Sequence, residues 1–307
     1  MKTGMRSSRL SPKQKLELIR KRLPQLRKIM EKCRLCPRAC GVNRLKDEIG
    51  DCGVGRYALL ASYGPHFGEE PVLVGRRCSG TVFFAGCNLA CVFCQNYDIS
   101  HLRRGYPVDA ETLASVFLEI QRMGCHNLNL VSPTHVSVQI VEALEIAFER
   151  GFDLPIVYNT GGYDPVRVLR LLDGIIDIYM PDIKYSDSKI AEKYSGVKHY
   201  WEVVRAAVRE MQRQVGDLDV ENGIAQKGLL IRHLVLPNRL AGSFKVVDFI
   251  VEEVSKDAYV NIMDQYYPAY KAFGYPELSR RITRQEYWEV VRYAMSKGIH
   301  RGIPFGL

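Results

Sequence analysis

Residues 81–94 read TVFFAGCNLACVFC, a short apolar run followed at once by three closely spaced cysteines. The run is rich in β-branched and aromatic residues, a composition that predicts a buried β-strand. Cys87, Cys91 and Cys94 then follow with the spacing Cys-x3-Cys-x2-Cys, on a loop at the carboxyl end of that strand. Barrel enzymes built of parallel strands carry their chemistry at this end. The stretch therefore predicts both the first strand of a β/α fold and a catalytic loop.

The three cysteines favour an iron–sulfur cluster over a structural zinc ion. Three thiolates this close together can hold three irons of a [4Fe-4S] cube, and the fourth iron, which has no protein ligand, is then free to bind a substrate. An open coordination position is typical of catalytic metal sites rather than structural ones. A zinc knuckle usually needs a fourth Cys or His within the local unit, and this loop has none.

From residue 81 onward, short apolar runs alternate with longer helical patterns, which is typical of a parallel sheet with crossover helices. Six β/α units are too few to close an eight-stranded barrel. We therefore expect an α/β fold with a partial (β/α)6 TIM-like barrel. Strands are predicted at residues 81–86, 126–132, 155–160, 175–183, 228–237 and 259–266, helices at 110–123, 136–150, 165–172, 189–194, 201–214, 243–254 and 283–296, and an exposed loop at 216–227.

The first 80 residues are expected to form a small basic, Cys-rich extension to a core domain of residues 81–307. Residues 1–56 carry 16 Lys and Arg against 5 Asp and Glu, whereas the remainder is nearly balanced at 27 against 29. Residues 12–30 have an imperfect amphipathic pattern, which favours a docked helix with a solvated basic face. A nucleic-acid contact is less favoured, because neither aromatic interleaving nor a known binding motif accompanies the charges. Without a signal peptide or a bilayer-length apolar run, we expect a cytoplasmic protein and no membrane association.

Four more cysteines precede the catalytic loop, with the spacing Cys33-x2-Cys36-x3-Cys40-x11-Cys52. In a reducing cytosol, closely spaced cysteines indicate metal ligation rather than disulfides. Four thiols imply a closed second site for zinc or for another iron–sulfur cluster, since tetrahedral thiolate sites accept either. Such a site would act as a folding staple or as an electron relay, and reduced thiols without metal are the alternative. The remaining two cysteines are interpreted as buried free thiols, Cys78 and Cys125.

The three-cysteine loop resembles that of the radical S-adenosylmethionine (SAM) superfamily, in which an aromatic residue, here Phe93, precedes the last cysteine. Nearly the whole chain, from about Cys33 to the last predicted helix, is similar to the PflX-type family, relatives of pyruvate formate-lyase activating enzyme. The segments that carry this resemblance are CRLCPRACGVNR (33–44), ASYGPHFGEEP (61–71), FFAGCNLACVFCQNYDIS (83–100), VYNTGGY (157–163), DIYMPDIKY (177–185), IRHLVLPN (231–238) and MDQYYPAY (263–270).

The resemblance implies an oxidoreductase in which SAM chelates the open iron and an electron cleaves its sulfonium to a 5'-deoxyadenosyl radical. A donor such as flavodoxin or ferredoxin would supply the electron. The radical would abstract a hydrogen, with a backbone glycine of a protein partner as the leading expectation. Radical modification or epimerisation of a small molecule is the alternative. Outside enzymes, the alternative is a basic metal-binding scaffold for nucleic acid.

The same resemblance implies SAM-binding residues at the ends of the strands. Residues 132–135 replace a Gly-Gly-Glu-like segment, with a plain helix cap as the alternative. Residues 158–162 and 180–184 are similar to elements that line the SAM pocket and help to bind a monovalent cation. At the fifth strand His233 is preferred to Arg232. The cofactor-binding candidates are therefore Phe93, Thr134, His135, Asn159, Thr160, Met180, Asp182, Lys184 and His233.

Three reservations follow from the residues themselves. Asn159 stands where the relatives have an acidic ligand of the cation. Asp182 and Lys184, two apart on one strand, would form a structural ion pair if they did not bind cofactor. His233 would be an ordinary core histidine if it faced the helices.

Overall fold

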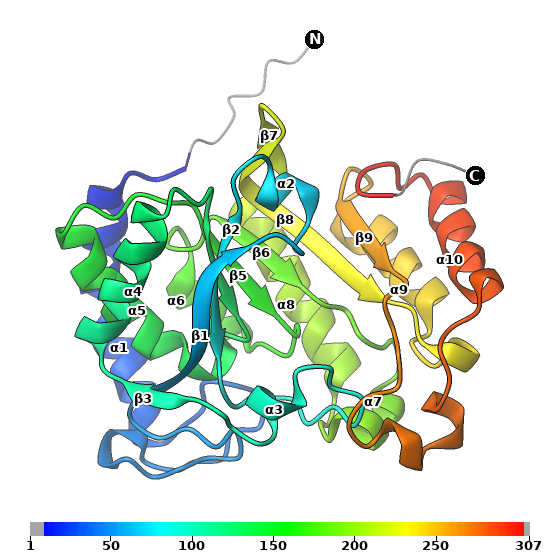
Figure 1. Cartoon of the computed structure of the whole chain (residues 1–307), viewed down its shortest axis with the longest axis horizontal. Helices are drawn as coiled ribbons and strands as arrows, with labels where there is room; N and C mark the ends of the chain where they lie inside the picture. The colour runs from blue at the N-terminus through cyan, green and yellow to red at the C-terminus, as the bar shows by residue number, and fades with distance from the viewer. Residues whose placement is uncertain (1–8, 304–307) are drawn as a thin grey trace.

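A computed structural model describes residues 9–303 as one mixed sheet with helices packed on it (Figure 1). Six neighbouring strands are parallel, and each overlaps one of the six that the apolar runs predict. Along the sheet they are β2 (Ser79–Phe84), β4 (Leu128–Val131), β5 (Ile156–Thr160), β6 (Ile178–Pro181), β8 (Ile224–Leu234) and β9 (Tyr259–Met263).

The parallel set does not close into a barrel. β2 pairs with β1 (Ala58–His66) on its outer side, and within residues 9–303 it has no pairing with β9 at the other end. β1 runs antiparallel to β2 and also pairs with β3 (Tyr106–Val108). The predicted partial barrel is therefore confirmed, with an antiparallel edge that the sequence patterns did not predict.

The prediction of a loop at residues 216–227 is wrong over part of that range. β7 (Asp219–Glu221) pairs antiparallel with β8 to form a hairpin. The chain reverses at Asn222 and Gly223, whose φ angles are +51° and +81°. An Asn-Gly pair favours such a turn because both residues tolerate positive φ.

Helices follow the strands where the sequence predicts them, and the first one docks on the core. They are α1 (Pro12–Glu31), α2 (Pro71–Val74), α3 (Tyr97–Ser100), α4 (Ala110–Arg122), α5 (Ser137–Glu149), α6 (Val166–Leu172), α7 (Ser188–Ser195), α8 (Tyr200–Val215), α9 (Ser243–Phe249) and α10 (Arg284–Ser296). Single turns are η1 (Arg44–Lys46), η2 (Thr134–Val136), η3 (Pro237–Arg239), η4 (Ile250–Val254), η5 (Ala272–Gly274) and η6 (Pro276–Leu278).

The amphipathic pattern of α1 is a docking face. Ile19, Leu23 and Leu26 are buried against the rest of the core, and the helix packs on α5. Lys15 on the same face is almost completely buried and forms an ion pair with Asp177, which precedes β6. The prediction of a docked helix is confirmed. None of the helices among residues 9–303 has both the length and the apolar character needed to cross a bilayer.

One face of the parallel strands carries a small apolar cluster of its own. A small apolar cluster on the inner face takes alternate residues of three strands: Val157 of β5, Ile178 and Met180 of β6, and Leu230 of β8. Leu73 of α2 packs on this cluster. Because side chains alternate along a strand, residues two positions further on continue the same face toward the carboxyl ends.

The segment between α1 and β1 meets the sheet at the carboxyl ends of the strands. In Figure 1 these ends point toward the lower part of the molecule, where α3 and the segment between α1 and β1 also lie. β1 and the first residues of β2 precede residue 81 but belong to the same sheet. A division of the chain at residue 80 stays a prediction.

Candidate active site

The cysteine loop leaves β2 through Gly86 and is fixed by its backbone. Gly86 has a φ of +79°, and a Cβ there would lie 2.4 Å from the carbonyl oxygen of Cys52. Glycine alone satisfies both the positive φ and this close approach. Further along the loop, the N–H of Val92 donates to the carbonyl of Tyr194 in α7 at 2.8 Å.

A cavity of about 350 Å³ lies beside this loop, and Cys87, Cys91 and Cys94 all line it. Burial raises the pKa of Cys87 to about 12, and burial also raises the pKa of Cys91. Without a bound metal these thiols are therefore neutral at physiological pH. Polar groups contact all three sulfurs: the Leu89 N–H at 3.4 Å from Cys87, the Ser195 hydroxyl at 3.0 Å from Cys91, and the Ser100 hydroxyl at 3.1 Å from Cys94.

The charged groups of the cavity form one network at the ends of β5, β6 and β8. Arg232 donates through Nε to Asp182 Oδ1 at 2.7 Å and through Nη2 to Asn159 Oδ1 at 2.7 Å. Lys184 Nζ contacts the second oxygen of Asp182 at 2.7 Å, and Glu69 lies 3.5 Å from Arg232 Nη1. Burial by itself would raise the pKa of Asp182, but the charges of Arg232 and Lys184 outweigh it and lower that pKa to about 2.

Five of the predicted cofactor-binding residues line this cavity: Phe93, Asn159, Thr160, Asp182 and Lys184. Phe93 also stacks edge-on against Tyr266, with ring centroids 5.7 Å apart. The alternative interpretation of Asp182 and Lys184 as an ion pair is confirmed, because they are bonded to each other in the cavity wall, whereas cofactor binding by these residues stays a prediction.

The comparisons with known proteins point to one family. The sequence model of the radical SAM superfamily matches residues 81–224. An uncharacterised protein of Methanocaldococcus jannaschii is 34% identical over 268 residues, which cover 84% of this chain and 72% of that protein. The chain belongs to the radical SAM superfamily.

The fold agrees with that membership. A radical SAM methyltransferase from Sphaerobacter thermophilus has a similar structure, with a TM-score of 0.52 at 13% identity, over 72% of this chain and 65% of the methyltransferase. The chain thus spans less than two thirds of that enzyme's length. At this identity the likeness concerns the fold alone.

His233 does not line the cavity beside the three cysteines, whereas Arg232 does, so the geometry does not support the preference for His233 over Arg232. Its Nδ1 lies 2.6 Å from the carbonyl of Ile183 and its Nε2 lies 2.8 Å from the hydroxyl of Ser243 at the start of α9. Burial lowers the pKa of His233 to about 4. Arg232 has the opposite facing in β8 and points into the cavity together with Leu234.

Three other candidates also lie outside the cavity lining. Thr134 belongs to a buried network in which it donates to Asp164 Oδ1 at 2.8 Å. His135 lies behind the cysteine loop, with Nε2 at 3.0 Å from the carbonyl of Ala85, and burial lowers its pKa to about 4. Met180 is packed in the apolar cluster below the cavity. None of these three side chains lies in the lining of the cavity beside the three cysteines.

Arg232 and Glu69 are the charged lining residues that the sequence analysis did not choose as cofactor-binding. The alternation of side chains along β8 could have identified Arg232. This residue is two positions from Leu230, in the apolar cluster, and from Leu234, in the cavity lining, so all three share one face. Glu69 belongs to the segment after β1, and no local pattern places it near the strand ends. Met263 and Gln265, after the last strand, also line the cavity.

The seven cysteines with predicted metal roles form two separate groups, and the other two cysteines meet each other. Cys33, Cys36 and Cys52 are buried and Cys40 is partly buried. Cys78 and Cys125 precede β2 and β4, with their sulfurs 2.7 Å apart, at the amino ends of the strands and so away from the cavity.

Across residues 9–303, no group of three or more His, Cys, Asp and Glu side chains is arranged to hold a single metal ion. A [4Fe-4S] cluster binds each thiolate through a different iron, so its ligands do not have to converge on one ion. The cavity loop offers three thiols, each with a polar partner. This donor chemistry fits such a cluster.

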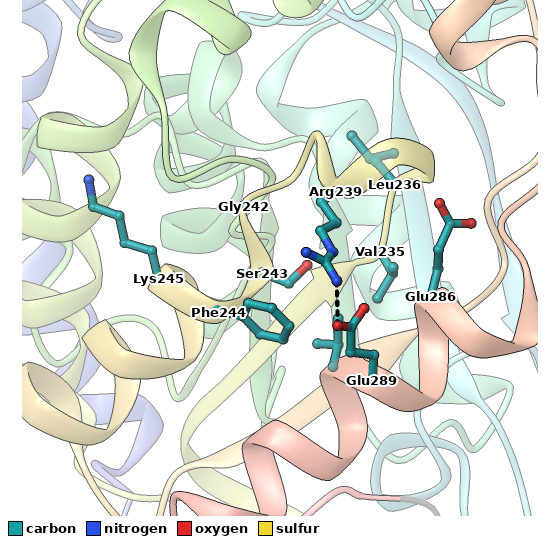
Figure 2. A pocket seen from close by; sticks show the side chains of 10 residues that line it. Val235, Leu236, Arg239, Gly242, Ser243, Phe244, Lys245, Glu286 and Glu289 are labelled. Atoms are coloured by element: carbon teal, nitrogen blue, oxygen red, sulfur yellow. Dashed lines mark hydrogen bonds and ion pairs between the residues drawn. The ribbon is translucent and has the colours of Figure 1, made fainter.

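A second cavity, of about 220 Å³, lies between the start of α9 and α10 (Figure 2). Its walls are mainly apolar, and Arg239 and Glu289 form an ion pair of 2.5 Å at its side. No cysteine lines it. It therefore has no ligand for the cofactor that the superfamily uses.

Proposed function

We propose that Cys87, Cys91 and Cys94 hold a [4Fe-4S] cluster with one open iron, and that SAM binds to it in the adjoining cavity. The observation that carries the proposal is the meeting of these three thiols with the charged strand ends of β5, β6 and β8 in one cavity. When bound, a cluster of this kind chelates SAM and supplies the electron that cleaves its sulfonium to a 5'-deoxyadenosyl radical.

The charged network is suited to orient the methionyl end of SAM. Arg232 and Lys184 offer donors to a carboxylate, and Glu69 offers an acceptor to an ammonium group. Because Asp182 already bonds to both cations, the network holds its geometry before the cofactor arrives. Such preorganisation keeps the reacting groups in place and lowers the cost of orientation.

We infer that Arg232 takes the place of a monovalent cation in this cavity. The oxygens of Asn159 and Asp182, which resemblance to the activating enzymes assigns to the cation, instead accept hydrogen bonds from one guanidinium. The side chain thus brings a fixed positive charge to the position where an ion would otherwise bind. Neutral Asn159 also removes one of the negative charges that would attract such an ion.

For the substrate, we propose a segment of a protein chain that presents a C–H bond, such as a glycine Cα–H, at the mouth of the cavity. A cavity of about 350 Å³ is near the lower limit for ligand sites. SAM would fill much of it, so a substrate would reach in from the mouth, as an extended loop can. The carbon–hydrogen bond would break as 5'-deoxyadenosine forms, leaving the radical on the substrate.

The experiment has two stages. Anaerobically reconstituted protein, reduced with dithionite, should convert SAM to 5'-deoxyadenosine. Deuterated protein fractions from the source cells, and separately deuterated small-molecule fractions, are then added. Deuterium in 5'-deoxyadenosine from the protein fraction supports a protein substrate. Deuterium from the small-molecule fraction alone would replace it with small-molecule chemistry, and no 5'-deoxyadenosine under any condition would contradict the proposal.

A further inference from the structure

The segment that carries Cys33, Cys36, Cys40 and Cys52 is folded into tight turns around its sulfurs. The N–H of Cys33 donates to the carbonyl of Val42 at 2.8 Å, and the N–H of Gly41 returns to the carbonyl of Cys33 at 3.0 Å. At Gly50 an added Cβ would lie only 2.8 Å from the sulfur of Cys40. The chain therefore closes on the thiols themselves, and electrostatic interactions link Cys36 to the other three.

Backbone N–H groups point at three of these four sulfurs with a fixed offset. The backbone N–H groups of the residues two positions ahead, which are Leu35, Arg38 and Val54, act on the sulfurs of Cys33, Cys36 and Cys52. The same offset recurs in the catalytic loop, where Leu89 donates to Cys87. The two cysteine segments thus share one local backbone pattern around their sulfurs.

The buried side chain of Arg44 gives a separate reason to expect negative charge on the group of four cysteines. Its side chain is completely buried, yet it has no ion pair with a carboxylate among residues 9–303. Nε donates to the carbonyl of Gly55 at 2.8 Å and Nη1 to that of His135 at 2.5 Å, both neutral groups. Nη2 is buried without a hydrogen-bond partner in the described part of the chain, and the Arg44 side chain acts electrostatically on the nearby Cys33.

A buried guanidinium without a counter-charge is costly. The charge of Arg44 acts on both Cys33 and Cys52. Four thiols bound to a metal centre would be thiolates, and their excess negative charge would balance Arg44. The burial of this arginine is therefore explained if the cysteine group is metallated.

The cysteine group is in direct contact with the catalytic loop. The carbonyl of Cys52 lies against Gly86, the residue before Cys87. Arg38, two residues after Cys36, donates through Nε to the carbonyl of Asn88, the residue after Cys87, at 2.7 Å. One hydrogen bond and one close backbone contact thus join the two cysteine segments.

We propose that Cys33, Cys36, Cys40 and Cys52 bind a second iron–sulfur cluster, which passes electrons to the cluster at Cys87, Cys91 and Cys94. This inference rests on the proposed function. In each transfer a low-potential donor of the flavodoxin or ferredoxin class loses one electron, the second cluster takes it up and releases it, and the catalytic cluster gains it. No bond breaks in the relay, and four protein ligands leave the second cluster no open iron for SAM.

The first test counts metal in the full-length protein. Wild type reconstituted with iron and sulfide should hold about eight iron and eight sulfide atoms, as two [4Fe-4S] clusters require. The Cys36→Ser/Cys40→Ser variant should lose about half of both. Cys78→Ser/Cys125→Ser, which alters the two cysteines outside both groups, should lose none. Wild-type iron in Cys36→Ser/Cys40→Ser, or a stoichiometric zinc in protein purified without added metal, would overturn the inference.

A second variant guards against misfolding and separates this inference from the proposed function. Cys87→Ala/Cys91→Ala/Cys94→Ala should retain one reducible cluster whose electron paramagnetic resonance spectrum is unchanged by SAM. If this triple variant holds no iron while wild type still cleaves SAM, the second cluster is absent and the catalytic one stands. If the remaining spectrum shifts with SAM, the assignment of the two clusters is reversed.

The relay itself is tested by the choice of reductant. With dithionite, Cys36→Ser/Cys40→Ser should form 5'-deoxyadenosine within about two-fold of wild type, because a small reductant reaches the catalytic cluster directly. With reduced flavodoxin or ferredoxin the rate should fall at least ten-fold, about 1.4 kcal/mol. Equal loss with both reductants would show a structural role and contradict the relay.

Discussion

Arg232 and Asp182 are joined by a 2.7 Å hydrogen bond across two neighbouring parallel strands, at the wall of the cavity that Cys87, Cys91 and Cys94 line. The same guanidinium bonds to Asn159. One side chain thus unites the ends of β5, β6 and β8, and it does so where a bound cation is expected in relatives.

If Arg232 replaces a cation, wild-type activity should not depend on potassium or sodium. Formation of 5'-deoxyadenosine should be unchanged when both are exchanged for a bulky organic cation. Arg232→Ala should lose about 10- to 100-fold in rate, the size expected for charged hydrogen bonds, with its iron content intact. Potassium should restore part of that loss. A wild-type enzyme that needs potassium would contradict the interpretation.

Gly86 should be intolerant of a side chain because of the carbonyl of Cys52. Gly124→Ala is a matched control, since its φ is +77° and nothing lies within 4 Å of the added Cβ. The control should cost about 1 kcal/mol from the left-handed backbone alone. Gly86→Ala adds a backbone clash and should cost about 2 kcal/mol more. Urea unfolding of both variants measures the difference, and equal losses would mean that the loop can move away from Cys52.

The ion pair between Lys15 and Asp177 should matter most when one partner is removed. Both side chains are buried, so Lys15→Met leaves an unpaired carboxylate and should cost about 3–5 kcal/mol. Lys15→Met/Asp177→Asn removes both charges and should recover much of that loss. A double variant as unstable as the single one, in urea unfolding, would show that α1 depends on packing lost at both positions rather than on the buried charge.

Acid should destabilise the protein through its two buried histidines. Burial lowers the pKa of His135 and His233 to about 4, against about 6.5 in an unfolded chain. The unfolded state therefore binds more protons between these values, so the contribution is complete above pH 6.5 and is lost as the pH falls toward 4. At pH 5 each histidine should have lost about 2 kcal/mol.

The measurement compares the free energy of unfolding at pH 7.5 and pH 5 for wild type and His233→Gln. The variant should show a smaller difference between the two pH values by about 2 kcal/mol. His300→Gln, at an exposed position, should behave as wild type. An unchanged difference in His233→Gln would mean that His233 is protonated in the folded state.

The parallel strands and their helices follow from the sequence because each strand is an apolar run between polar turns. β1 and β3 do not, since more than half of β1 is not buried and its stability comes from pairing with β2 and β3. The β7–β8 hairpin had a local signal in Asn222 and Gly223. The polar composition of residues 216–227 is typical of a loop and masks this turn signal.

The candidate site was predictable where spacing or facing decides it. Cys87, Cys91 and Cys94 follow from their spacing, and Asn159, Asp182 and Lys184 from the family resemblance of the segments at the strand ends. His233 was misassigned because the choice between adjacent residues depends on which face of β8 is covered by helices. Thr134 and His135 were misassigned because the chain turns at Ser132, with a φ of +56°, and carries both into the core.

The most direct test of the account is formation of 5'-deoxyadenosine by anaerobically reconstituted, dithionite-reduced protein carrying single substitutions in the catalytic loop. Cys87→Ala, Cys91→Ala and Cys94→Ala should each abolish cleavage of SAM, while Cys78→Ala, a buried cysteine outside the cavity, should retain it. If any of the three loop variants cleaves SAM at the wild-type rate, or if wild type binds a cluster yet never produces 5'-deoxyadenosine, the proposed radical site is contradicted.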